Sequence, residues 1–200
     1  GYKQIKLKNN LLFRILDSTF FEDDTFSSSE FKKFNRFVGY YQNLKYIDLA
    51  KSELKSKLDL YNKQEQVNLA AIHIRKTDYS VIDQELKNSY YEKAIAQLLT
   101  INKNLKFDIF TDDENIDIDE NIFKNTNKIY TPLQDQNSTE VLKAMVNYKY
   151  YIIANSSFSA IAAFLSNLND KVVFYPDPWW RNSSVKLTGI PSSWIKVKNL

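Results

Sequence analysis

The chain has 200 residues, with three Gly, one His, no Cys and a formal net charge of +3. So few glycines exclude the glycine loops of Walker-type and dinucleotide-binding sites, and the missing cysteines exclude disulfides and thiolate metal ligands. At 44% hydrophobic and 26% charged residues the chain can bury a core, and its charges form no block that indicates nucleic-acid binding.

The N-terminal part of the chain predicts helices and loops. Residues 42–60 predict a helix with an apolar stripe. The stripe consists of Leu44, Ile47, Leu54 and Leu58. We expect residues 1–62 to form a helical and loop adjunct, or the remnant of a neighbouring domain, and residues 63–200 to form the main domain.

From residue 67 onward, predicted strands and helices alternate. The predicted strands are 67–74, 107–111, 128–130, 151–154 and 171–175. The predicted helices are 88–101, 138–149 and 158–167, with a turn and a short helix at 112–124 and a last short element at 194–197. This alternation predicts an α/β fold with a Rossmann-like, doubly wound parallel sheet.

Polar and aromatic clusters follow four of the predicted strands, at the point where each strand ends. The clusters are His73–Tyr79, Thr111–Asp113, Asn155–Ser159 and Tyr175–Trp180. Ligands of open α/β sheets bind at the carboxyl ends of the strands. We therefore expect the four clusters to line one binding cleft.

The first cluster carries the only histidine and one of four arginines. His73 and Arg75 alternate along a strand, so both point to the same side. The planar guanidinium of Arg75 suits a diphosphate, Lys76 adds a second positive charge, and Asp78 would orient the arginine or bind a hydroxyl. A buried histidine beside a surface ion pair is the alternative.

The third cluster joins a strand to a helix. Asn155, Ser156 and Ser157 stand where free backbone N–H groups of a helix N-terminus favour a bound anion. Ordinary N-capping by Asn155 or Ser156 is the alternative.

The sequence does not decide the roles of the second and fourth clusters. Asp112 and Asp113 suit a divalent metal or sugar hydroxyls, or form a solvated turn; no third carboxylate stands at ligand spacing, which disfavours a metal. Trp179 and Trp180 either stack on a base or sugar, or pack under the C-terminal tail.

In their order along the chain, these segments resemble the donor-binding half of the α-1,2-fucosyltransferases of glycosyltransferase family 11. The matching segments are His73–Tyr79, Tyr90–Ile95, Phe110–Asp113, Ile152–Ser159, 172–180 and 191–197, preceded by 37–46. The similarity covers residues 37–197 and implies a donor domain of the GT-B type.

The resemblance implies an inverting transferase that takes a GDP-sugar, normally GDP-β-L-fucose, and forms an α-1,2 bond to a galactose-type acceptor. It implies no cofactor and no obligatory metal. By position, Arg75 would be the catalytic residue at the leaving diphosphate. The nucleotide-binding residues would be His73, Lys76, Asp78, Asp112, Asn155, Ser156, Ser157 and Ser159.

The sequence departs from the family pattern at several positions. Lys76 and Thr77 stand where the family has a second arginine and a glycine, and Ala160 and Ile161 replace two tryptophans. The family's glycine-rich N-terminal loop and acceptor-side domain have no counterpart in this chain. We therefore expect the general base to lie outside it, and the chain alone to be incomplete for catalysis.

The family implies a setting in bacterial O-antigen or lipopolysaccharide assembly. We expect a cytoplasmic protein with peripheral contact at the inner face of the membrane, acting on a galactose-containing glycan or a lipid-linked oligosaccharide. One alternative is a non-catalytic nucleotide- or glycan-binding module of the same fold. Another is a structural partner of a separate acceptor-domain subunit.

Overall fold

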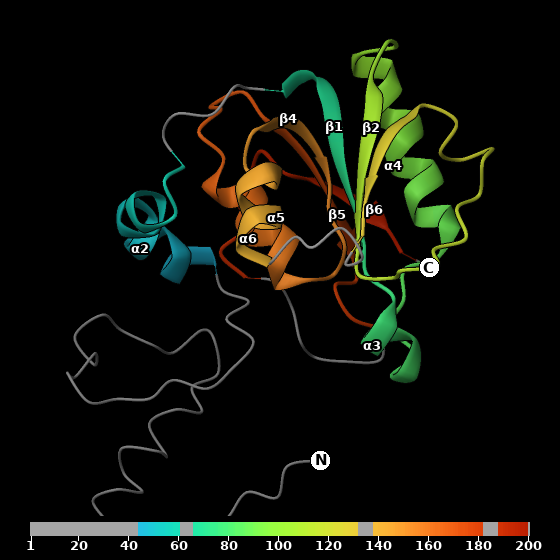
Figure 1. Cartoon of the computed structure of the whole chain (residues 1–200), viewed down its shortest axis with the longest axis horizontal. Helices are drawn as coiled ribbons and strands as arrows, with labels where there is room; N and C mark the ends of the chain where they lie inside the picture. Colours follow the sequence, from blue (N-terminus) through green and yellow to red (C-terminus); the bar gives the residue numbers. More distant parts are fainter. Residues whose placement is uncertain (1–43, 61–65, 132–137, 182–187, 200) are drawn as a thin grey trace, which may run out of the picture.

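The computed structural model describes residues 44–60, 66–131, 138–181 and 188–199 (Figure 1). The strands are β1 (Gln66–Ile74), β2 (Lys106–Thr111), β3 (Thr126–Tyr130), β4 (Tyr148–Ile152), β5 (Val172–Asp177) and β6 (Ile195–Lys198). The helices are α2 (Leu44–Lys57), α3 (Thr77–Val81), α4 (Asn88–Ile101), α5 (Ser138–Met145) and α6 (Ser157–Leu165).

The six strands form one parallel sheet in the order β3-β2-β1-β4-β5-β6. The chain builds outward from β1 to β3 and then crosses back to place β4 beside β1. This order is that of dinucleotide-binding folds, and its reversal between β1 and β4 is the topological switch point where such sheets bind ligands. The predicted Rossmann-like parallel sheet is confirmed.

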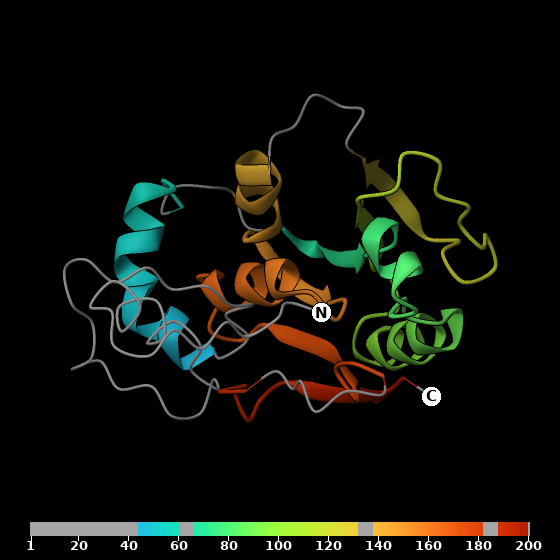
Figure 2. The ribbon, with the colours of Figure 1, turned by 90° about the horizontal axis from the view of Figure 1, so that it is seen from below.

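Helices cover both faces of the sheet (Figures 1 and 2). Alternate residues of β1 supply the two cores: Ala71 faces the core beneath α5 and α6, whereas Ala70 and Ile72 face the core beneath α4. Both alanines are fully buried, so the central strand accepts helices on each side.

The N-terminal helix α2 packs against α6, and Leu44 belongs to the same apolar core as α6. Residues 1–43 of the predicted adjunct lie outside the described residues. The division of the chain at residue 62 stays a prediction. Among the helices of the described segments, none has both the length and the apolar character needed to cross a bilayer.

The structure differs from the predicted elements in three main places. The helix predicted at 138–149 ends at Met145, because the Asn147 side chain donates to the carbonyl of Lys143 and β4 begins at Tyr148. The short helix expected within 112–124 is replaced by turns, in which the carboxylates of Asp113 and Asp119 accept backbone N–H groups two residues on.

The third difference is a helix that was not predicted. The short helix α3 begins at Thr77, directly after β1, and carries Asp78 and Tyr79. Its place at the carboxyl end of the sheet is visible in Figure 1. The helix places Asp78 and Tyr79, the last residues of the first polar cluster, at the carboxyl ends of the strands.

Candidate functional site

A cavity of about 500 Å³ opens at the carboxyl ends of the strands. Its wall is formed by the ends of β1 and β2 and by the segments that follow β1, β2, β3 and β4, so it straddles the switch point. Its lining residues are His73, Arg75, Asp78, Tyr79, Ile82, Phe110, Thr111, Asp112, Thr131, Ser138, Val141, Ser156, Ser157, Phe158 and Trp180. Six of the nine predicted site residues are among them.

Arg75 follows β1 and is held by two carboxylates. Its Nη2 lies 2.8 Å from Asp78 Oδ1, and its Nη1 lies 3.1 Å from Asp112 Oδ2. The guanidinium carbon also lies 5.6 Å from the centre of the Tyr79 ring, within cation–π range. A pre-positioned guanidinium with partly exposed faces can bind an anion without first being ordered.

The carboxylate of Asp112 anchors the turn that follows β1. It accepts the backbone N–H of Lys76 over 2.8 Å and the hydroxyl of Thr77. Asp113 turns away and accepts the N–H of Asn115. Within the described segments, no three acidic or histidine side chains converge into a group able to hold a metal ion.

His73 is buried and lies two residues before Arg75. The centre of its ring is 6.0 Å from that of the Phe158 ring. Burial lowers the pKa of His73 to about 4; Asp112 opposes this shift and Arg75 adds to it. The ring is therefore neutral at pH 7. Its Nδ1 has no hydrogen-bond partner among the described residues, which leaves one polar atom available at a cavity-lining side chain.

The N-terminus of α6 forms another part of the cavity wall. Ser156 is the N-cap residue, yet no side-chain hydrogen bond caps the helix. Asn155 does not cap the helix either, because its Oδ1 accepts no hydrogen bond from the described residues, while its amide nitrogen donates to the carbonyl of Gln84 over 2.9 Å. The first N–H groups of α6 thus lack a side-chain acceptor, and this end of a helix favours a negative charge.

Three predicted residues do not line the cavity. Lys76 contributes its backbone N–H to Asp112, Asn155 is buried behind the wall, and Ser159 is buried within α6 with its hydroxyl donating to Ser156 O. Their contact with a ligand stays a prediction.

The two tryptophans have different environments. Trp179 is buried in the core, whereas Trp180 lines the cavity with its ring 5.7 Å from that of Tyr79. Next to them, the backbone of Arg181 exchanges two hydrogen bonds with the side chain of Gln84, which fixes this loop to the segment after α3.

The sequence interpretation missed three lining residues on the far side of the cavity. Thr131 follows β3, and Ser138 and Val141 lie in the first turn of α5. The rule that ligands bind at strand ends applies to β3 as well, so Thr131 could have been predicted from the sequence. Nothing in the sequence indicates which face of α5 turns to the cavity.

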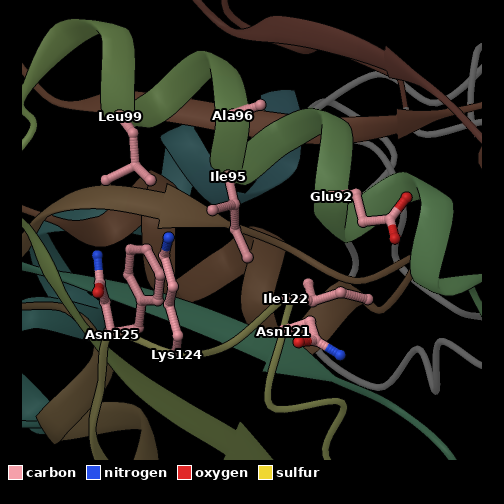
Figure 3. Close-up of a pocket in the computed structure, with 9 residues that line it drawn as sticks. Glu92, Ile95, Ala96, Leu99, Asn121, Ile122, Lys124 and Asn125 are labelled. Carbon is pink, nitrogen blue, oxygen red and sulfur yellow. The ribbon is translucent and has the colours of Figure 1, made fainter.

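A second cavity, of about 260 Å³, lies between α4 and the segment before β3 (Figure 3). Ile95 and Leu99 point from α4 towards Ile122 and Asn125. It lies towards the amino ends of β2 and β3 and contains none of the strand-end clusters, so the cavity around Arg75 is the candidate site.

Comparisons with known proteins identify relatives of one kind. An α-1,2-colitosyltransferase of Escherichia coli is 30% identical over an alignment of 185 residues, which covers 81% of this chain and 62% of that protein. The O-antigen biosynthesis glycosyltransferase WbnK of E. coli is 32% identical over an alignment of 155 residues, which covers 72% of this chain and 50% of that protein. The chain thus spans about half to three-fifths of these relatives. No family model matches the sequence.

Among solved structures, the E. coli heptosyltransferase WaaC with ADP matches 72% of this chain and 42% of that chain, with a TM-score of 0.45 and 10% identity. The two curated glycosyltransferases are homologous to most of the chain. These relatives are fucosyltransferase-like glycosyltransferases of family 11, the family that the sequence of this chain resembles.

Proposed function

We propose that the cavity around Arg75 binds the diphosphate of a GDP-sugar, and that the whole protein transfers the sugar to a galactose-type hydroxyl. The observation that carries this proposal is that Arg75 and the N-terminus of α6 line the same cavity at the switch point. Both groups favour an anion such as a diphosphate.

The chemistry is an inverting glycosyl transfer. The acceptor hydroxyl gives its proton to the general base while its oxygen attacks the anomeric carbon. The bond to the diphosphate breaks, its electron pair leaves with the diphosphate, and the configuration inverts in that single step. Negative charge grows on the leaving diphosphate, where Arg75 and the N–H groups of α6 lower the barrier. His73 serves as a neutral hydrogen-bonding group, because its pKa of about 4 keeps it uncharged at pH 7.

The names of the relatives support the finer points. One is named for an α-1,2 transfer of colitose and the other for O-antigen biosynthesis. We therefore propose an α-1,2 linkage, L-fucose or a related deoxyhexose as the donor sugar, and an acceptor in O-antigen assembly at the inner face of a bacterial membrane. The acceptor-side half and the general base are supplied from outside the 200 residues.

The test is ligand-induced thermal stabilisation of the chain. A ligand at a hundredfold excess over its Kd stabilises the folded state by about 2.7 kcal/mol. GDP and GDP-fucose should raise the Tm, and Arg75→Ala should abolish the rise. The matched control is Lys149→Ala, which removes another half-buried cation from an ion pair with Asp170, at the amino end of β4 and outside the residues that line the cavity.

A GDP response that survives Arg75→Ala would contradict the assignment of Arg75. A response to another nucleotide, without one to GDP or GDP-fucose, would overturn the donor. Binding of GDP-fucose with no transfer to a galactoside, measured in a chain that includes the acceptor-side half, would favour the non-catalytic nucleotide-binding module.

A further inference from the structure

The two carboxylates that share Arg75 are held very differently. The Asp112 side chain is 17% exposed, whereas that of Asp78 is 59% exposed. Both lie within ion-pair distance of the guanidinium, one at each terminal nitrogen. Arg75 is therefore fully neutralised, and an incoming diphosphate has to compete for it.

Asp112 cannot leave without disrupting the turn after β1. Besides Arg75, it holds the backbone N–H of Lys76 and the hydroxyl of Thr77. It also stands directly after β2, which pairs with β1 up to Ile74 and Thr111. Releasing Asp112 would break three interactions at a half-buried position, where lost partners are costly.

Asp78 can leave at little cost. Among the described residues, its other hydrogen-bond partner is the Thr77 hydroxyl, at 3.5 Å, the limit of a hydrogen bond. An exposed ion pair contributes little to stability, because water solvates both charges when they separate. A rotation of the Asp78 side chain into solvent is enough to free Arg75 Nη2.

Arg75 keeps its position when Asp78 leaves. The next residue, Tyr79, lies against the guanidinium and donates its hydroxyl to the carbonyl of Asn155 over 3.1 Å. This bond ties α3 to the end of β4. The helix can therefore stay in place while the side chain of Asp78 exchanges.

We propose that Asp78 is an exchangeable counter-ion of Arg75, which the donor diphosphate displaces, and that Asp112 is the permanent positioning residue. This inference rests on the proposed function, since it assumes that a diphosphate binds at Arg75. In the empty site Asp78 neutralises the cation. In the occupied site two phosphate oxygens take its place, and Asp112 keeps the guanidinium plane aimed at them.

The experiment compares three variants by calorimetric titration with GDP, guanosine and inorganic pyrophosphate. Asp78→Asn should tighten GDP and pyrophosphate binding by roughly three- to tenfold, because it removes a competing negative charge beside the diphosphate. Guanosine affinity should not change. Asp112→Asn should weaken GDP binding by about tenfold or more, because the guanidinium loses its fixed partner.

The matched control is Asp113→Asn, which removes the same charge one residue from Asp112 but touches no atom of Arg75. Its effect on GDP binding should be less than twofold. Asp78 is exposed and Asp113 is half-buried, so we expect both of these variants to fold. The comparison of Asp78→Asn with Asp113→Asn therefore tests the exchange even if Asp112→Asn unfolds.

Equal or weaker GDP binding by Asp78→Asn, with tight binding by the wild type, would overturn the exchange and leave the donor site standing. An increase that Asp113→Asn matches would also overturn it, since the gain would then reflect net charge alone. Absence of GDP and pyrophosphate binding by the wild type would overturn both the exchange and the proposed function.

Discussion

The hydroxyl of Tyr79 donates a hydrogen bond to the backbone carbonyl of Asn155 over 3.1 Å, joining positions 76 residues apart. Tyr79 follows β1 and Asn155 follows β4, so this bond spans the switch point of the sheet. The two strand ends that form the centre of the candidate site are thus fixed to each other by a buried contact.

Tyr79→Phe should lower the free energy of unfolding by about 1 kcal/mol, because the buried Asn155 carbonyl loses this donor. Urea unfolding measures the change. Ser80→Ala, at the exposed neighbouring position, should leave the midpoint nearly unchanged. Equal midpoints for wild type and Tyr79→Phe would show that the bond contributes nothing to stability.

His73 should make the protein acid-sensitive. Burial lowers its folded-state pKa to about 4, against about 6.5 in an unfolded chain, so the unfolded state binds the proton more tightly. The contribution of neutral His73 is complete above pH 6.5 and is lost as the pH falls towards 4. By pH 4.5 the loss amounts to about 2–3 kcal/mol.

The measurement is urea unfolding at pH 7 and pH 4.5, for wild type and for His73→Gln. The drop in unfolding free energy between the two pH values should be smaller in the variant, which has no imidazole to protonate. The carboxylates titrate equally in both proteins, so their effect cancels. Identical drops would contradict the buried neutral state of His73.

Ala160→Trp should destabilise the protein, although the family pattern has tryptophan at this position. Ala160 is fully buried in α6 and belongs to the core beneath that helix. A larger side chain at a closely packed site typically lowers the free energy of unfolding by about 1–3 kcal/mol or more. Thermal unfolding measures the loss.

Ile161→Trp is its control, because Ile161 is only half-buried and has room to reorient. Its loss of stability should be smaller. An equal Tm for wild type and Ala160→Trp would mean that this core keeps space for the family's ring, and that the alanine is not a packing adaptation.

The alternation of strands and helices was readable because each element carries its own periodicity. Residues 67–74, for example, form an apolar run, and β1 begins one residue earlier, at Gln66. The boundary between α5 and β4 was not readable, because apolar and aromatic residues continue from Val141 to Ile153 with only single polar residues between them. Pairing of Tyr148 and Tyr150 with β1 decides where the strand begins.

The candidate site was predictable in part. The clusters after β1, β2, β4 and β5 each supply side chains to the cavity, as the strand-end rule predicts. The backbone role of Lys76 and the burial of Ser159 behind the wall were not predictable, because sequence position does not say which atoms of a turn face inward.

By itself, the sequence determined the class of fold, the polar edge of the sheet and the pair His73 and Arg75, because these follow from local periodicity and from the scarcity of both residue types. Only the tertiary structure decided the strand order, the switch point between β1 and β4, and the two ion pairs of Arg75 with Asp78 and Asp112. These features depend on contacts between segments far apart in the chain, and the unequal burial of two carboxylates arises only once the strands pair.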